Sequence, residues 1–70
     1  MNWIETPESS NIVRFKYNPE TKVLTVEFLK GGIYNYFDVP ESVFEQMKIA
    51  PSKGQFLAKS IKAKYRYARA

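Results

Sequence analysis

Apolar and polar residues alternate along three short runs of this chain, a pattern typical of β-strands. The runs lie at about residues 11–17, 22–29 and 33–37. The second is the plainest, with every other residue apolar from Leu24 to Phe28. Because short turn sequences separate the runs, the pattern predicts a three-stranded antiparallel meander.

Two turn sequences predict how these strands pair. Asn18-Pro19-Glu20-Thr21 has proline at a favoured turn position, and Gly31-Gly32 supplies the positive φ angles of a two-residue hairpin. With four loop residues in the first turn, Phe15 lies opposite Leu24. With two loop residues in the second turn, Val26 lies opposite Phe37.

This register divides the sheet into an apolar and a mixed face, since opposed residues share a face. The apolar face, which we expect to form the core, collects Val13, Phe15, Leu24, Val26, Phe28, Ile33 and Phe37. The mixed face collects Ile12, Arg14, Lys16, Val23, Thr25, Glu27, Leu29, Tyr34 and Tyr36. A β-bulge would exchange part of the two sets.

Two helices are predicted after the sheet. Pro40 suits a first helical turn, and the apolar stripe Val43, Phe44 and Met47 follows it. Beyond Pro51, Ser52 and Gln55 have the spacing of a capping box for a second helix, which we expect to stop before Lys64. The predicted fold is α+β: a three-stranded antiparallel meander, two short helices on its apolar face, and a short basic C-terminal arm or strand. Residues 1–8 are interpreted as an irregular lead-in and 9–70 as a single domain.

The composition limits the chemistry. The 70 residues include neither cysteine nor histidine, which removes disulfides, thiol nucleophiles and the usual zinc ligands. Glu41 and Glu45 share a helix face, but an acidic first turn favoured by the helix dipole explains them better than an acid/base pair. We therefore expect no enzyme, no metal and no cofactor. Without a secretory signal or a membrane-length apolar run, the expected location is cytoplasmic, with no membrane partner.

Charge is distributed unevenly. Residues 53–70 hold six cations and no acid, whereas residues 1–52 hold five cations and seven acids. Basic side chains interleaved with aromatic ones are typical of nucleic-acid binding, to RNA or DNA. The predicted binding residues are Lys53, Lys59, Lys62, Lys64, Tyr65, Arg66 and Arg69. The alternative is a solvated helix end on which the tyrosines pack.

The start of the second helix is a candidate anion site. Ser52, Lys53 and Gly54 would offer backbone N–H groups, one positive charge and close approach to a phosphate. The alternative, which the sequence favours, is an ordinary cap in which Ser52 accepts a hydrogen bond from the helix itself.

The mixed sheet face suggests a second function. Arg14, Lys16, Tyr34 and Tyr36 together resemble a base-stacking platform. The alternatives are burial of this face under Trp3 and Ile4, under a helix, or against another copy of the chain. The last of these predicts a protein-interaction module and a homodimer. The residues of that interaction face are Ile12, Arg14, Lys16, Leu29, Tyr34 and Tyr36, with Val23 beside them.

Several short motifs in order resemble the KTSC domain. They are Ser9-Ser10-Asn11-Ile12, Tyr17-Asn18-Pro19-Glu20-Thr21, Leu24-Thr25-Val26-Glu27-Phe28, Gly31-Gly32-Ile33-Tyr34-Asn35-Tyr36-Phe37-Asp38-Val39-Pro40, and Ala50-Pro51-Ser52-Lys53-Gly54 followed by Ile61 and Tyr65. The resemblance implies a small α+β module without an established catalytic activity, found alone and at the C-terminus of some lysyl-tRNA synthetases. It therefore implies a supporting role near RNA and carries over no catalytic residue. Ala58 and Ala63 depart from the polar or glycine residues that relatives often have there.

Overall fold

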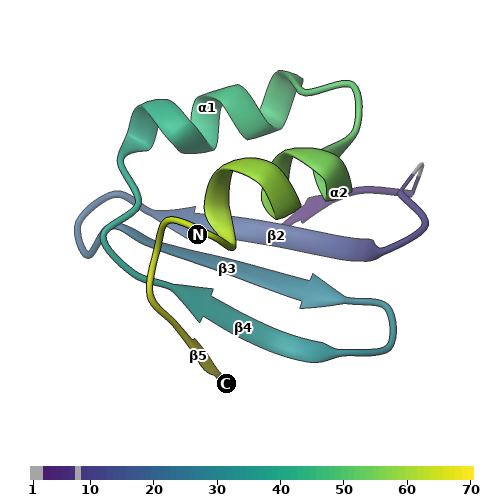
Figure 1. The fold of residues 1–70 in the computed structure, drawn as a ribbon, viewed down its shortest axis with the longest axis horizontal. Helices are drawn as coiled ribbons and strands as arrows, with labels where there is room; N and C mark the ends of the chain where they lie inside the picture. The colour runs from purple at the N-terminus through teal and green to yellow at the C-terminus, as the bar shows by residue number, and fades with distance from the viewer. Residues whose placement is uncertain (1–2, 8) are drawn as a thin grey trace.

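The computed structural model describes residues 3–7 and 9–70, which form one antiparallel sheet with helices on one side (Figure 1). The five strands lie side by side in chain order: β1 (Ile4–Glu5), β2 (Ile12–Asn18), β3 (Val23–Phe28), β4 (Gly32–Tyr36) and β5 (Tyr67–Arg69). The helices are α1 (Glu41–Ile49), α2 (Lys53–Phe56) and the π-helical turn η1 (Leu57–Ile61), which continues α2. The α+β class is confirmed. The predicted three-stranded meander gains β1 at one edge, and the predicted C-terminal arm or strand pairs at the other edge as β5.

Within the predicted irregular lead-in, residues 3–7 contain a short strand, and residues 1, 2 and 8 lie outside the described ranges. Ile4 pairs with Phe15, so β1 forms the edge of the sheet beside β2. Thr6 is buried just after it, and its hydroxyl donates to the carbonyl oxygen of Ile12 at 2.5 Å. The Thr6 backbone N–H donates to the Val13 carbonyl at 3.1 Å. Thr6 thus satisfies two backbone acceptors where β2 bulges.

The predicted pairing of β2 with β3 is wrong by two positions, and the bulge changes one more. Phe15 lies opposite Val26 rather than Leu24, because Asn18 pairs with Val23 and the loop comprises residues 19–22. The Asn18 side-chain oxygen accepts from the Glu20 N–H at 2.9 Å, which fixes this loop. An even shift leaves Phe15 on the core face. The bulge between Ile12 and Arg14 buries Ile12 in place of Val13.

The predicted Gly31-Gly32 hairpin is also wrong, with a larger consequence. The loop has three residues, 29–31, and Gly32 pairs with Phe28 at a φ of 86°. Val26 therefore faces Tyr34 rather than Phe37. This odd shift exchanges the two sides of β4. Tyr34 and Tyr36 point toward the helices, whereas Ile33 points to the uncovered side.

The core lies between the sheet and the helices. Its buried apolar residues are Ile12, Phe15, Tyr17, Leu24, Val26, Tyr36, Val39, Met47, Leu57 and Ile61. The helix boundaries agree with the prediction: α1 begins after Pro40, and η1 ends at Ile61, before Lys64. Ser52 caps α2 by accepting from the Gln55 N–H at 3.3 Å. Helix stripes and sheet face thus bury each other, as amphipathic elements require.

Candidate nucleic-acid interface

The basic C-terminal arm is a strand that extends the helix-facing surface of the sheet. In β5, Tyr67 lies opposite Tyr36, and Arg69 lies opposite Tyr34. Opposed residues share a face, so Tyr67 and Arg69 join the tyrosines on the side of the helices. The Tyr67 ring centroid is 5.7 Å from that of Tyr34 and 5.8 Å from that of Tyr36. The result is a cluster of three tyrosines on β4 and β5.

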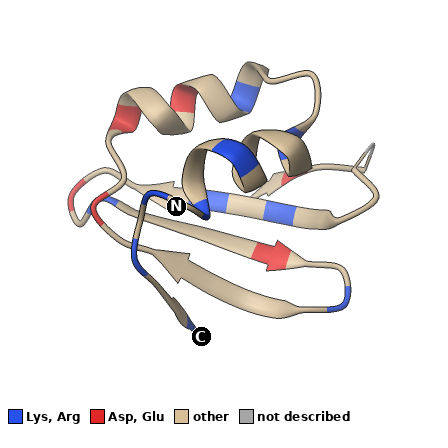
Figure 2. Ribbon diagram, in the orientation of Figure 1, with Lys and Arg blue, Asp and Glu red and all other residues tan. Residues whose placement is uncertain are grey.

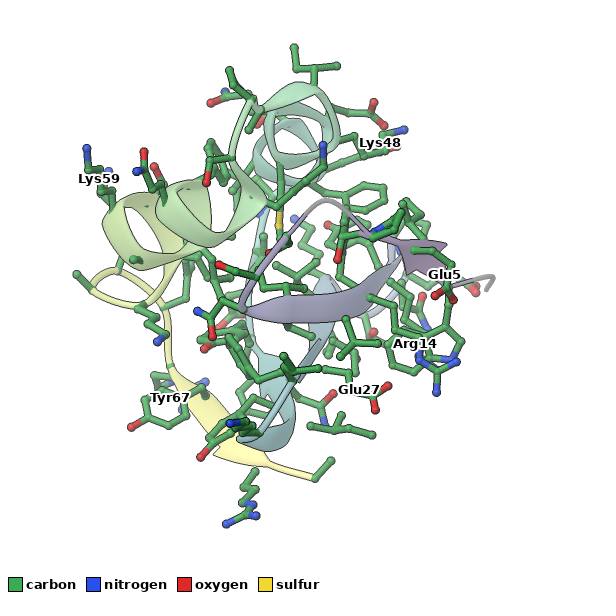
Figure 3. All side chains as sticks on the ribbon, turned by 90° about the vertical axis from the view of Figure 1, so that its right-hand side faces the viewer. Glu5, Arg14, Glu27, Lys48, Lys59 and Tyr67 are labelled. Carbon is green, nitrogen blue, oxygen red and sulfur yellow. The ribbon has the colours of Figure 1, made fainter. Side chains whose placement is uncertain are left out.

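This cluster lines a hollow of about 560 Å³ beside the end of η1. Figure 3 shows Tyr67 on β5 below the second helix, on the opposite side of the sheet from Arg14 and Glu27. The remaining lining residues come from the residue before β2, the end of β3, the β3–β4 loop and the residue after η1. The complete lining is Asn11, Phe28, Lys30, Gly31, Tyr34, Tyr36, Lys62 and Tyr67. Among the described residues, no Asp or Glu lines this hollow.

Two cationic side chains, Lys62 and Arg69, lie beside the aromatic rings of the hollow. The Lys62 Nζ lies 5.2 Å from the centroid of the Phe28 ring, within cation–π range. Arg69 lies at the adjacent edge, with its guanidinium over Gly32. A Cβ placed on Gly32 would stand only 3.2 Å from the Arg69 Nε. The absence of a side chain at Gly32 therefore makes room for this guanidinium.

The predicted basic set does not form one surface. Figure 2 shows cations from α2 to the C-terminus, and Lys62 and Arg69 are the ones beside the tyrosines. Lys59 points away from the sheet on the outer side of the second helix (Figure 3). Arg66 has its Nη2 3.5 Å from Asp38 Oδ2, and both side chains are largely exposed. Lys53 and Lys64 also lie outside the lining of the hollow.

The aromatic partner in the predicted set also changes. Tyr65 is half-buried and packs against the core, whereas Tyr67 is 59% exposed. The predicted set contains Tyr65 and leaves out Tyr67. It also leaves out Lys30, because the β3–β4 loop is far from the basic end in sequence. The alternation of tyrosine with arginine in residues 65–69 was a usable signal for Tyr67.

Around Ser52, the structure shows the cap, and the anion site stays a prediction. The Ser52 hydroxyl is engaged by the Gln55 N–H, and the Lys53 Nζ is 3.2 Å from the Ala50 carbonyl oxygen. A polar hollow of about 480 Å³ adjoins this turn, and its wall includes Ser9 and Asn11. Ser9 and Asn11 belong to the first of the KTSC-like motifs and Ser52 to the last, so these two motifs line the same hollow.

The predicted interaction face is divided between the two sides of the sheet. Ile12, Tyr34 and Tyr36 belong to the helix-facing side, because the bulge and the three-residue loop reverse them. Leu29 lies in that loop and is 60% exposed. Arg14 and Lys16 remain on the uncovered side and lie over the Trp3 ring, at 4.2 and 4.5 Å from its centroid. The Arg14 Nε also contacts Glu27 Oε1 at 2.6 Å.

Burial affects the acidity of the tyrosine cluster. Burial raises the pKa of Tyr36 above its ordinary value, and the neighbouring Tyr67 and Tyr34 phenols raise it further. The Tyr36 phenol is therefore uncharged at neutral pH. An uncharged phenol in a cationic hollow does not repel an anion.

The described part of the chain shows neither a cluster of acidic residues that could hold a metal ion nor a helix that could span a membrane. No group of three or more Asp or Glu residues in ranges 3–7 and 9–70 is arranged to hold a metal. In those same ranges, every helix is too short or too polar to cross a bilayer.

The meander, its two edge strands and its one-sided helices define a small α+β module. The KTSC domain model matches residues 8–65, and the chain belongs to this family. It is 49% identical over 61 residues to the lysine–tRNA ligases of Nostoc sp. and Nostoc punctiforme. That match covers 87% of this chain but only 11% of each ligase. A crystal structure of a KTSC domain protein from Yersinia pestis has a TM-score of 0.94 and 30% identity, covering 99% of this chain and 96% of that one.

Proposed function

We propose that this chain is a non-catalytic module that binds nucleic acid, mainly through the phosphate backbone. The observation that carries the proposal is the hollow in which Tyr34 and Tyr67 meet Lys30 and Lys62, with Arg69 at its edge. Lysines and arginines supply the phosphate contacts that dominate such binding. Aromatic rings between them supply stacking surfaces for bases.

The relatives support RNA as the first ligand to test. The Nostoc proteins are named as ligases that act on tRNA, and a domain similar to this chain makes up 11% of their length. We expect weak sequence preference, because phosphate contacts carry no sequence information.

The test is binding of the purified protein to a labelled tRNA pool and to a mixed DNA duplex across a range of salt concentrations. If Lys30, Lys62 and Arg69 each contact a phosphate, log K falls with log[salt] with a slope of roughly −2 to −3. The double variant Lys30→Ala/Lys62→Ala should flatten the slope by roughly two units or less.

Lys16→Ala is the matched control for the single variant Lys62→Ala, because it removes one lysine from the opposite side of the sheet. It should leave the slope as it is. The proposal fails if no nucleic acid binds at low salt. It also fails if Lys16→Ala weakens binding while the double variant does not, which would transfer the function to the uncovered face.

The uncovered face favours a second candidate function, that of a protein-interaction module. A homodimer formed through this face is one form of it. Ile33 and Phe37 are only half-buried there, and the described chain places its helices on the other side (Figure 1). Measuring molar mass against concentration tests this candidate. Ile33→Glu should abolish any dimer and leave nucleic-acid binding intact. A constant monomer mass up to high concentration would exclude the homodimer.

A further inference from the structure

The hollow on β4 and β5 has the size of a small-ligand site. Its volume of about 560 Å³ falls within the range of roughly 300–1,000 Å³ that ligand pockets show. It lies between Lys62, after η1, and Lys30, in the β3–β4 loop, with the sheet as its floor. A nucleic-acid duplex keeps its base faces stacked within itself, so it can present phosphates, sugars and base edges to such a recess, but no base face. A strand with unpaired bases can insert one.

The rings of the hollow are held in place and one of them remains accessible. Tyr67 is 59% exposed, although Tyr34 and Tyr36 contact its ring at tilts of 53° and 41°. Tyr34 is itself fixed by an edge-on contact with Phe28, whose ring centroid is 5.7 Å away. A base stacking on Tyr67 therefore meets a ring that has already lost much of its freedom. Preorganisation of this kind lowers the entropic cost of binding.

Two cations lie beside this ring surface. The Lys62 ammonium lies over Phe28, and the Arg69 guanidinium lies over Gly32, the residue that pairs with Phe28. Consecutive phosphates of a strand flank each base, so the phosphates beside a base in the hollow would lie within reach of these two cations. The described residues contribute no acid to the lining that would oppose them.

We propose that this hollow binds one unpaired nucleotide of a single strand, with its base stacked on Tyr67 and its flanking phosphates near Lys62 and Arg69. This inference rests on the nucleic-acid binding proposed above and adds the substrate class. The module would then prefer loops, overhangs and strand ends to paired regions. Base stacking is sequence-tolerant, because every base has a π-face.

The experiment compares an unstructured single-stranded RNA of twelve nucleotides with the same sequence annealed to its complement, both labelled and at the same salt concentration. The single strand should bind at least tenfold more tightly. Tyr67→Leu should weaken single-strand binding by roughly 5- to 150-fold, the loss expected for one stacked base, and leave the salt slope unchanged because no charge is removed. Tyr67→Phe keeps the ring and should bind within about twofold of the original protein.

A second measurement uses the unaltered protein, in case Tyr67→Leu disturbs β5. A strand carrying 5-iodouracil is irradiated in complex with the protein, and the adduct is mapped by mass spectrometry. The adduct is expected on Tyr67, and an adduct on Trp3 would overturn the inference. Equal affinity for single strand and duplex, unchanged by Tyr67→Leu, overturns this inference but leaves the proposed function standing. Binding to neither overturns both.

Discussion

Tyr17 and Tyr67 lie on the same side of the sheet and have opposite surroundings. Tyr17 lies beneath α1, is 2% exposed, and stacks on Phe44 with ring centroids 4.8 Å apart. Its hydroxyl donates to the Val39 carbonyl oxygen at 2.5 Å. Tyr67, at the far edge, is 59% exposed, and its ring lies against those of Tyr34 and Tyr36. How far the helices extend across the sheet determines whether a tyrosine on this face is buried in the core or remains accessible to a ligand.

The same difference separates the two regions to which these residues belong. The covered region comprises β2, β3 and the helices, and it contains most of the buried apolar side chains. The edge region comprises β4 and β5, and every residue of β5 is exposed. A chain of this size has little core to spare, so we expect stability to depend on the covered region and binding on the edge region.

Phe15→Ala, in the covered region, should cause the largest loss of stability. Phe15 is fully buried, and its ring meets Phe44 edge-on at 5.9 Å. Removing a buried phenylalanine ring costs about 3–5 kcal/mol, which is close to the whole stability of a domain this small. Urea denaturation followed by circular dichroism should show a largely unfolded variant. Leu29→Ala, at an exposed loop position, is the control and should cost less than about 0.5 kcal/mol. Equal losses in the two variants would mean that the covered region is not the source of stability.

Tyr17→Phe should have an intermediate effect that depends on pH. Burial raises the pKa of Tyr17, and the nearby Glu41 carboxylate raises it further. Because the folded pKa lies above the ordinary value of about 10, the folded state holds this proton more tightly. The stability that follows is complete below about pH 10 and is lost as the pH rises through the folded pKa.

The measurement for Tyr17 is the free energy of unfolding in urea at several pH values from 7 to 11. At pH 7, Tyr17→Phe should cost about 1 kcal/mol for the lost hydrogen bond to Val39. Above pH 10, the original protein should lose stability faster than the variant. Tyr36 contributes a similar alkaline loss in both proteins, since its pKa is raised as well. Parallel curves for the two proteins would contradict the role given to Tyr17.

The parts of the fold that depend on residues close together in the sequence could be predicted. The alternation around Val26, the proline before α1 and the Ser52 cap each depend on residues close by, and each is confirmed. The sides of Ile12 and Val13 could not be predicted, because the carbonyl groups at the bulge accept hydrogen bonds from Thr6, which lies outside the strand and its turn. The residues of β4 lie on the sides opposite to those predicted, because the loop before β4 has three residues instead of two.

The candidate site was predicted less completely, because it is assembled from distant segments. The charge asymmetry pointed to the basic end, and Lys62 and Arg69 do lie beside the tyrosine cluster. Joining Lys30 to them requires knowing that β5 pairs with β4, a pairing between segments about thirty residues apart. Nothing in the local sequence of either segment specifies that contact.

Arg66→Ala should have the smallest effect on stability, although Arg66 lies where the chain enters β5. Its ion pair with Asp38 spans 3.5 Å, and both side chains are mostly exposed, so solvent screening leaves it with less than about 0.5 kcal/mol. The Arg66 backbone carbonyl already accepts the Phe37 N–H at 2.9 Å, so the chain is held there without the side chain.

A double-mutant cycle with Asp38→Asn measures the pair, since asparagine tolerates the φ of 58° that Asp38 adopts. The coupling energy should lie within about 0.5 kcal/mol of zero. A coupling above about 1 kcal/mol would show that a surface ion pair anchors β5. The edge region of β4 and β5 would then supply part of the stability that the burial pattern assigns to the core. Added salt would weaken the attachment of β5 as well as the contacts of the site with its ligand.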